Sequence, residues 1–169
     1  MTFIAGTSTR IDVAPHPRLC AAIMDWERCA RVADLADART LVVSDDVRPW
    51  CGIADVGPGA ATFRYSFFGA QLCAAFGRDM TGRSPSELDP PGYAEIIVQQ
   101  YVEATAARRP LIHAVWSAAL PNDLYYRVTI PFSNGGAEVA QLWMVTAHLK
   151  RFAAGLPTRA RDLDAVLFA

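Results

Sequence analysis

The chain has 169 residues, of which 52% are hydrophobic and 20% charged, and its formal net charge is −1. This length fits one domain with a sizeable apolar core, and the composition is typical of a soluble globular protein. The small net charge provides no field that would attract nucleic acid or an anionic membrane, so we expect neither as a partner. No apolar run reaches the ~18 residues of a membrane-spanning helix, which argues against that class as well.

The cysteines and the first residues indicate a cytoplasmic protein. The four cysteines are far apart and include no CxxC pair; they are Cys20, Cys29, Cys51 and Cys73. This spacing argues against a zinc site and against a disulfide framework, and fits a reducing compartment. The first residues lack a basic segment followed by a long apolar run, so we expect no secretory signal.

Residues 1–38 are predicted to form a lead-in and an amphipathic helix. Residues 1–15 have no periodic pattern and read as irregular. In residues 18–38, apolar side chains recur at helical spacing on one face; they are Leu19, Ala22, Ile23, Trp26, Ala30 and Ala33. Because Trp26 is a large side chain to leave in water, we expect this helix to pack on a sheet face or against a second copy.

Two strands joined by a Gly-Pro-Gly turn are predicted next. Residues 51–56 form the first strand, and the second begins at Thr62. In the second strand Phe63, Tyr65 and Phe67 alternate with other residues, so we expect these three rings on one face of the sheet.

Helices are predicted to follow this hairpin. Residues 70–76 are small and apolar and read as a short helix that stops at Gly77. Residues 93–108 have a longer apolar stripe, which includes Tyr93, Ile97, Gln100 and Tyr101, and Pro110 prevents continuation.

Three strands complete the predicted order. They cover residues 111–120, 124–132 and 138–149, and turn-forming residues separate them, so we expect an antiparallel meander. The whole order predicts an α+β fold: a five-stranded antiparallel sheet with short helices and one long helix on one face, plus the N-terminal helix. Residues 150–169 are a tail in which a short helix is predicted over 158–168.

Several short motifs resemble those of a PAS sensor domain. A strand ends at Gly69, and the run from Gly77 to Gly82 reads GRDMTG. Later motifs are RRP over 108–110 and YR over 126–127, the latter followed by PFS over 131–133. The order of motifs over residues 16–149 is similar to that of a family of small, mostly alphaproteobacterial single-PAS proteins. The resemblance divides the chain into the N-terminal part (1–38), a PAS core (39–149) and the tail (150–169).

The resemblance implies a bacterial sensory or protein-interaction module with a compartment between the sheet and its helices. Residues that would line it are Tyr65, Phe67, Cys73, Phe76, Ile97, Tyr101, Trp116, Tyr126 and Trp143, with Arg64, His113 and Arg127 as polar anchors. The compartment would hold a small apolar or anionic ligand, or none. A shift of one residue in strand register would move these side chains to the opposite face.

The resemblance also bears on cofactors and partners. Haem-binding PAS domains place their histidine on the long helix, and residues 93–108 contain none. Flavin-reactive PAS domains carry a GxNCRFLQ motif that Cys73 lacks, so haem and flavin are both disfavoured and the cofactor stays unknown. We expect no metal site at the lone His113, a homodimer through the N-terminal helix and a sheet face, and a separate effector protein, since no effector domain follows the PAS core.

Three functions from different classes fit the sequence. No catalytic motif is recognisable, so the leading interpretation is a sensory module that binds a ligand or a protein partner without catalysis. The first alternative is a small cone-shaped α+β enzyme or carrier of the ketosteroid-isomerase type, which needs an acid or tyrosine inside its cavity. The second is a dimerisation module whose interior is filled by its own aromatic rings.

Overall fold

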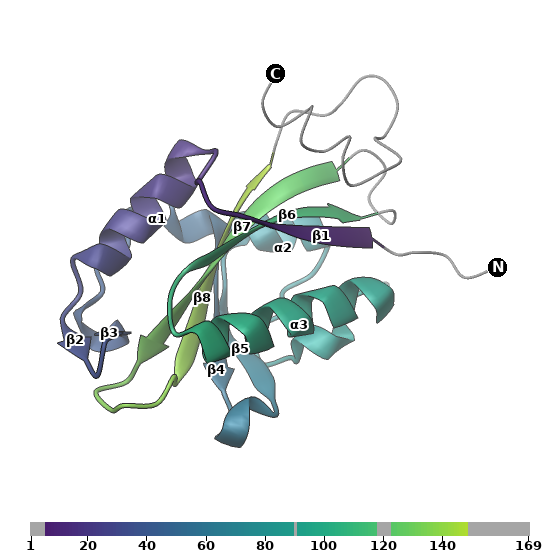
Figure 1. The fold of residues 1–169 in the computed structure, drawn as a ribbon. Helices are drawn as coiled ribbons and strands as arrows, with labels where there is room; N and C mark the ends of the chain where they lie inside the picture. Colours follow the sequence, from purple (N-terminus) through teal and green to yellow (C-terminus); the bar gives the residue numbers. More distant parts are fainter. Residues whose placement is uncertain (1–5, 90, 118–122, 149–169) are drawn as a thin grey trace.

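The structure is a computed structural model that describes residues 6–89, 91–117 and 123–148, with side chains for residues 10–89, 91–115 and 125–147. In this part of the chain, one open sheet of eight strands packs with three α-helices (Figure 1). The strands are β1 (Gly6–Ile11), β2 (Arg31–Val32), β3 (Leu35–Asp37), β4 (Cys51–Val56), β5 (Phe63–Phe68), β6 (Leu111–Ser117), β7 (Asp123–Ser133) and β8 (Gln141–His148). The helices are α1 (Pro17–Glu27), α2 (Ala70–Phe76) and α3 (Pro91–Ala107), and single 3₁₀ turns are η1 (Ala38–Thr40), η2 (Arg48–Trp50), η3 (Pro58–Ala60) and η4 (Pro85–Glu87).

The main sheet is antiparallel and has the order β1-β6-β7-β8-β4-β5. The short hairpin β2–β3 attaches beside it, where β3 runs parallel to β7 over two residue pairs. The predicted α+β class and antiparallel sheet are therefore confirmed. The predicted number of five strands is wrong, because β1, β2 and β3 arise in segments expected to be irregular or helical.

The predicted N-terminal helix over residues 18–38 is wrong in its second half. In the structure α1 begins at Pro17, where the ring nitrogen of His16 accepts a hydrogen bond from the Arg18 amide at 3.1 Å, and it ends at Glu27. Beyond it, Ala33 and Asp34 adopt positive φ angles of 49° and 67° and turn the chain between β2 and β3. Burial of the β3 side chains outweighs the local helix preference that the apolar spacing of the sequence indicates.

The lead-in also departs from the sequence-based expectation. Gly6–Ile11 forms β1, an edge strand that pairs with β6 along its whole length, including Arg10 opposite His113. Pairing with a distant strand satisfies the β1 backbone groups that face β6, and the local sequence contains no signal for that partner.

The short and long helices that follow the hairpin are predicted correctly. α2 covers residues 70–76 as expected and stops at Gly77, which has a left-handed φ of 72°. The preceding turn requires Gly69, because a Cβ there would collide with the backbone carbonyls of Arg48 and Pro49. α3 begins two residues before the start of the predicted 93–108 helix and ends one residue before its predicted end.

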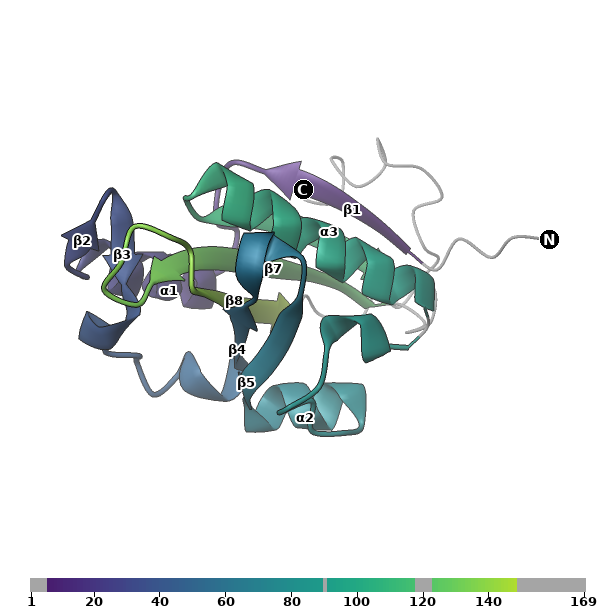
Figure 2. The same cartoon turned by 90° about the horizontal axis from the view of Figure 1, so that it is seen from below.

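Two separate cores lie on the two faces of the sheet. We call the face beneath α3, α2 and η4 the inner face and the face beneath α1 the outer face (Figures 1 and 2). The inner core includes Phe63, Tyr65, Phe68, Leu72, Met80, Tyr93, Ile97, Tyr101, Val115, Tyr125, Leu142 and Met144. The outer core includes Leu19, Ala22, Cys51, Ile112, Ala114, Tyr126, Val128, Ile130, Phe132 and Val145, with Trp26 partly buried against it.

A β-bulge changes the predicted facing of the second strand. Ile53 pairs with Phe67 and Ala54 pairs with Tyr65, so Ser66 is an extra residue in β5. Phe63 and Tyr65 consequently lie in the inner core, whereas Phe67 packs against the outer core and Phe68 takes the inner position. The prediction that Phe67 shares a face with Tyr65 is wrong for this reason.

The three C-terminal strands are confirmed, with ends that differ from the predicted ones by a few residues. The predicted turn at 121–123 lies largely outside the described residues, and so does the tail 150–169 with its expected helix over 158–168. Among the helices that the structure describes, none has the length and apolar character needed to cross a membrane.

Candidate functional site

A row of three buried polar residues crosses the inner face of the sheet. His113 on β6 is the direct partner of Arg127 on β7, and Arg127 is the direct partner of Thr146 on β8. Their exposed fractions are 3%, 3% and 2%. Direct cross-strand partners share a face of the sheet, and contacts of Arg127 and His113 with α3 identify this as the inner face. We call these three residues the polar row.

The guanidinium of Arg127 is surrounded by neutral groups. Its Nη1 donates to Oε1 of Gln100 at 3.3 Å, and its Nη2 lies 3.1 Å from the Tyr125 hydroxyl and 3.4 Å from the Tyr93 hydroxyl. None of the carboxylates that the structure describes forms an ion pair with it. A buried charge without a countercharge is costly, so this arrangement is unusual for a purely structural interior.

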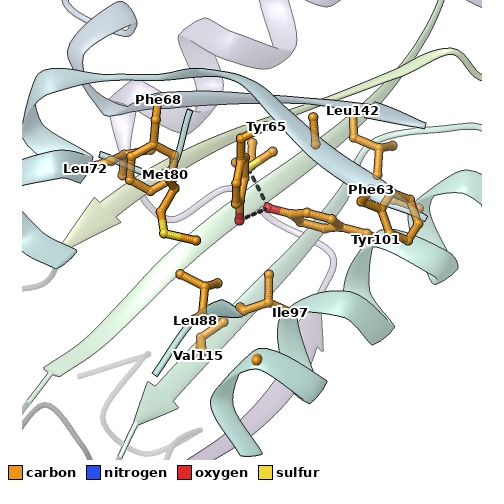
Figure 3. Packing of buried hydrophobic residues seen from close by; sticks show 14 of the residues in the cluster. Phe63, Tyr65, Phe68, Leu72, Met80, Leu88, Ile97, Tyr101, Val115 and Leu142 are labelled. Carbon is orange, nitrogen blue, oxygen red and sulfur yellow. Dashed lines mark hydrogen bonds between the residues drawn. The ribbon is translucent and has the colours of Figure 1, made fainter. Parts of the chain in front are cut away.

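Four tyrosine hydroxyls form two hydrogen-bonded pairs around this cation. The hydroxyls of Tyr65 and Tyr101 lie 2.9 Å apart and point toward one another between β5 and α3 (Figure 3), and those of Tyr93 and Tyr125 also bond. Burial raises the pKa values of Tyr65, Tyr101 and Tyr125, because it disfavours the phenolate. These three phenols are therefore neutral at physiological pH and do not neutralise Arg127.

Each member of the polar row also has a buried atom with no hydrogen-bond partner among the described residues. These atoms are Nδ1 of His113, Nε of Arg127 and Oγ1 of Thr146. A buried polar atom that is left unpaired costs about 1–3 kcal/mol. Nε of Arg127 can only donate, and the Thr146 hydroxyl can donate or accept. The row thus offers donors on two adjacent strands to a group that accepts hydrogen bonds.

His113 lies at the rim of the row. Its Nε2 is 3.3 Å from a carboxylate oxygen of Glu103, a partly exposed residue of α3. Burial lowers the pKa of His113 from its ordinary value of 6.5, and Glu103 opposes this shift. In the neutral ring the nitrogen facing Glu103 carries the proton, which leaves Nδ1 as an acceptor. In the part of the chain that the structure describes, no three potential metal ligands cluster.

A second hollow lies on the outer face, where α1 does not cover β4 and β5. This groove has a volume of about 420 Å³ and is lined by Leu41, Val42, Val43, Arg48, Cys51, Ile53, Phe67 and Trp143. Val42 is 81% exposed at its edge. The groove is largely apolar, and burial raises the pKa of the Cys51 thiol, so that thiol stays protonated.

The predicted site residues therefore divide between two places. Tyr65, Ile97 and Tyr101 lie in the inner core, Cys73 and Phe76 pack against it with partial exposure, and His113 and Arg127 belong to the polar row. Phe67, Tyr126 and Trp143 lie on the outer side, so the predicted single compartment for all of them is wrong. Trp116 is in β6, and its side chain lies outside the described ones. Arg64 is exposed and donates to the carbonyl of Gly82 at 2.6 Å, away from the interior.

Four residues around Arg127 are absent from the predicted set: Tyr93, Gln100, Tyr125 and Thr146. Three of them had a usable signal. Tyr93 and Gln100 fall in the predicted stripe of the long helix, and Tyr125 is two positions from Arg127 on the same strand face. For Thr146, alternation with Leu142 and Met144 on β8 places it inward only once the inner face of that strand is known.

Compared with protein-family models and with curated proteins, the sequence matches none.

Proposed function

We propose that this chain is a PAS-type sensory module that binds a small molecule between its sheet and α3, without catalysis, and signals through a separate protein. The strand arrangement supports the proposal. Without β1, β2 and β3, five strands remain, and their order across the sheet is β5-β4-β8-β7-β6. Numbered along the chain, these are the second, first, fifth, fourth and third of the five. Along the chain, two of these strands precede α2 and α3 and three follow them, which is the order expected here for a PAS core.

The observation that carries the proposal is the polar row inside an otherwise apolar core. An arginine and a histidine buried beneath α3 lower the stability of the fold relative to apolar residues of similar volume. We take their presence there as support for recognition of a molecule that enters the interior. Strongly desolvated charged groups in an interior are a general mark of functional sites.

The surroundings of the row suggest how its occupancy reaches the surface. Arg127 contacts Tyr93 and Gln100 of α3, while its neighbours Tyr126 and Val128 on β7 pack in the outer core. On β8 the backbone carbonyl of Thr146 accepts a hydrogen bond from Arg18 of α1 at 3.3 Å. We propose that a ligand which shifts the row also shifts α1, and that α1 with the outer face contacts a second copy or a cytoplasmic effector.

The enzyme alternative would use an acid in the interior. Of the described carboxylates, the one that contacts the polar row is Glu103, whose side chain is 43% exposed at the rim. Within each tyrosine pair the two hydroxyls are hydrogen-bonded to one another, and burial raises the pKa values of Tyr65, Tyr101 and Tyr125. We therefore propose binding and not proton transfer as the role of this interior.

The test uses the full chain with two readouts. Native mass spectrometry of protein purified from its own host reports a retained molecule, and a thermal-shift screen with neutral, cationic and anionic small molecules reports added ones. Hydrogen exchange with a bound compound should show protection in α3 and also in α1. Val42→Ser, in the outer groove, should leave the thermal shift unchanged. A screen without any stabilising compound, together with a bare native mass, would contradict the proposal.

A further inference from the structure

We infer that the polar row recognises a small organic carboxylate with an apolar body, bound through Arg127 and Thr146. The inference rests on the proposed function and specifies which class of molecule the module senses.

The first argument is charge. The guanidinium group of arginine stays protonated in proteins. Arg127 is 3% exposed, and the groups that it contacts are neutral. The nearest tyrosine hydroxyls, those of Tyr93 and Tyr125, are paired with each other, and burial raises the pKa of Tyr125 and so disfavours its phenolate. An incoming carboxylate would supply the missing negative charge inside a region of low dielectric constant, where such an interaction is strongest.

The second argument is the position of the unpaired donors. The two Nη atoms of Arg127 face Gln100, Tyr93 and Tyr125, whereas its Nε has no partner among the described residues. Thr146, whose hydroxyl is unpaired, is the direct partner of Arg127 on the neighbouring strand β8. The Cβ atoms of such direct partners lie about 5 Å apart. A carboxylate has two oxygens, so one can accept from each strand.

The third argument is the setting of these donors. Two residues along β8 from Thr146 lies Met144, and two along β6 from His113 lies Val115, both in the inner core. Ile97 of α3 belongs to the same core. A ligand whose charged end reaches the row would place the rest of its body among apolar side chains, which favours a hydrophobic acid over a small inorganic anion.

The experiment compares matched acids and amides on the full chain by titration calorimetry at neutral pH. The probes are phenylacetate with phenylacetamide, and hexanoate with hexanamide. Each pair has nearly the same shape and differs in charge. We expect each carboxylate to bind about 10- to 100-fold more tightly than its amide. This ratio corresponds to the contribution of about 1.5–3 kcal/mol that a hydrogen bond to a charged group makes.

Variants assign the contact to named atoms. Arg127→Met should remove the preference for the acid, and Thr146→Val should weaken acid binding about 10-fold with little effect on the amide. Arg64→Met is the matched control, since it removes an exposed arginine from β5. Thr129→Val is the control for the hydroxyl, because Thr129 is also buried and unpaired but lies opposite Leu111 and Met144. Both controls should bind like the wild type.

The possible outcomes separate this inference from the proposed function. Equal affinity for acid and amide, or stabilisation by neutral compounds alone, overturns the carboxylate inference while the sensory proposal stands. Binding that survives in both Arg127→Met and Thr146→Val also overturns it. If neither acids, amides nor any compound of the wider screen binds, both fail. Should Arg127→Met not fold, the acid–amide comparison on the wild type and Thr146→Val still decide.

Discussion

Along β7, successive side chains enter two different environments. Tyr126, Val128 and Ile130 pack beneath α1 in the outer core, whereas Tyr125 and Arg127 turn toward α3. The outer side of this strand is apolar. On the inner side, Arg127 of β7 lies in a continuous row with His113 of β6 and Thr146 of β8.

The difference separates the residues that hold the sheet together from those that we propose recognise a ligand. The outer core and the apolar part of the inner core supply burial, which stabilises the fold. The polar row has the opposite effect, because its members lose hydration and keep unpaired atoms. If the comparison is right, substitutions in the two groups should change stability in opposite directions.

The largest effect is expected from apolar truncation on either face. Leu19→Ala in the outer core and Ile97→Ala in the inner core each remove a fully buried side chain. Each should lower the free energy of unfolding by about 2–5 kcal/mol. Urea denaturation monitored by circular dichroism measures both. A small loss for Ile97→Ala alone would mean that the inner core is loosely packed, and would weaken the comparison.

Arg127→Met is expected to act in the other direction. Replacing a buried, unneutralised guanidinium by an apolar chain of similar length should leave the free energy of unfolding unchanged or raise it by up to about 2 kcal/mol. Arg127→Ala is the matched variant that adds a cavity, so it should be less stable than Arg127→Met. Urea denaturation without added carboxylate is the measurement. A loss above about 2 kcal/mol in Arg127→Met would assign the guanidinium a structural role.

The histidine of the row predicts a pH dependence. Burial lowers the pKa of His113 below 6.5, with Arg127 and Arg10 adding to the shift and Glu103 opposing it. Between the lowered pKa and 6.5 the unfolded chain binds more protons than the folded one, so stability should fall as the pH drops below 6.5.

Unfolding curves of wild type and His113→Gln at a series of pH values measure this effect. Both proteins keep His16, whose pKa burial also lowers, so the difference between the two curves isolates His113. The wild type should lose more stability on acidification than the variant. Parallel curves would mean that burial in the polar row does not disfavour protonation of His113.

The smallest effect is expected at Arg64, an arginine of the same chemistry in an exposed position on β5. Arg64→Met should change the free energy of unfolding by no more than about 0.5 kcal/mol. The same urea titration measures it beside Arg127→Met. A larger change would mean that the bond to the Gly82 carbonyl contributes to the turn after α2, and the pair of variants would no longer differ by burial alone.

The sequence pattern predicted the parts of the fold that local chemistry determines. α2 with its glycine stop, α3 with its following proline and the C-terminal strands all agree with their periodicity and turn residues. The parts it missed depend on distant partners. The extra residue Ser66 reverses the facing of Phe67, and the alternation of the strand gives no sign of it.

The candidate site was predicted to a similar degree. Arg127, His113, Tyr65 and Tyr101 were named, because polar residues in apolar strands and aromatic residues on a helix stripe are visible in the sequence. The assembly of His113, Arg127 and Thr146 into the polar row could not be predicted, since it depends on the register between β6, β7 and β8. Thr146 has no distinguishing property until that register is known.

The edge strand β1 has a consequence for how the molecule assembles. It pairs with β6 across most of the length of the sequence, and β6 must already be fixed in the meander before β1 can join it. We expect β1 to dock late and to detach at lower free energy than the central strands. We expect that a strand with these properties can leave its own sheet and complete that of a neighbouring molecule, so that exchange of β1 would link two copies.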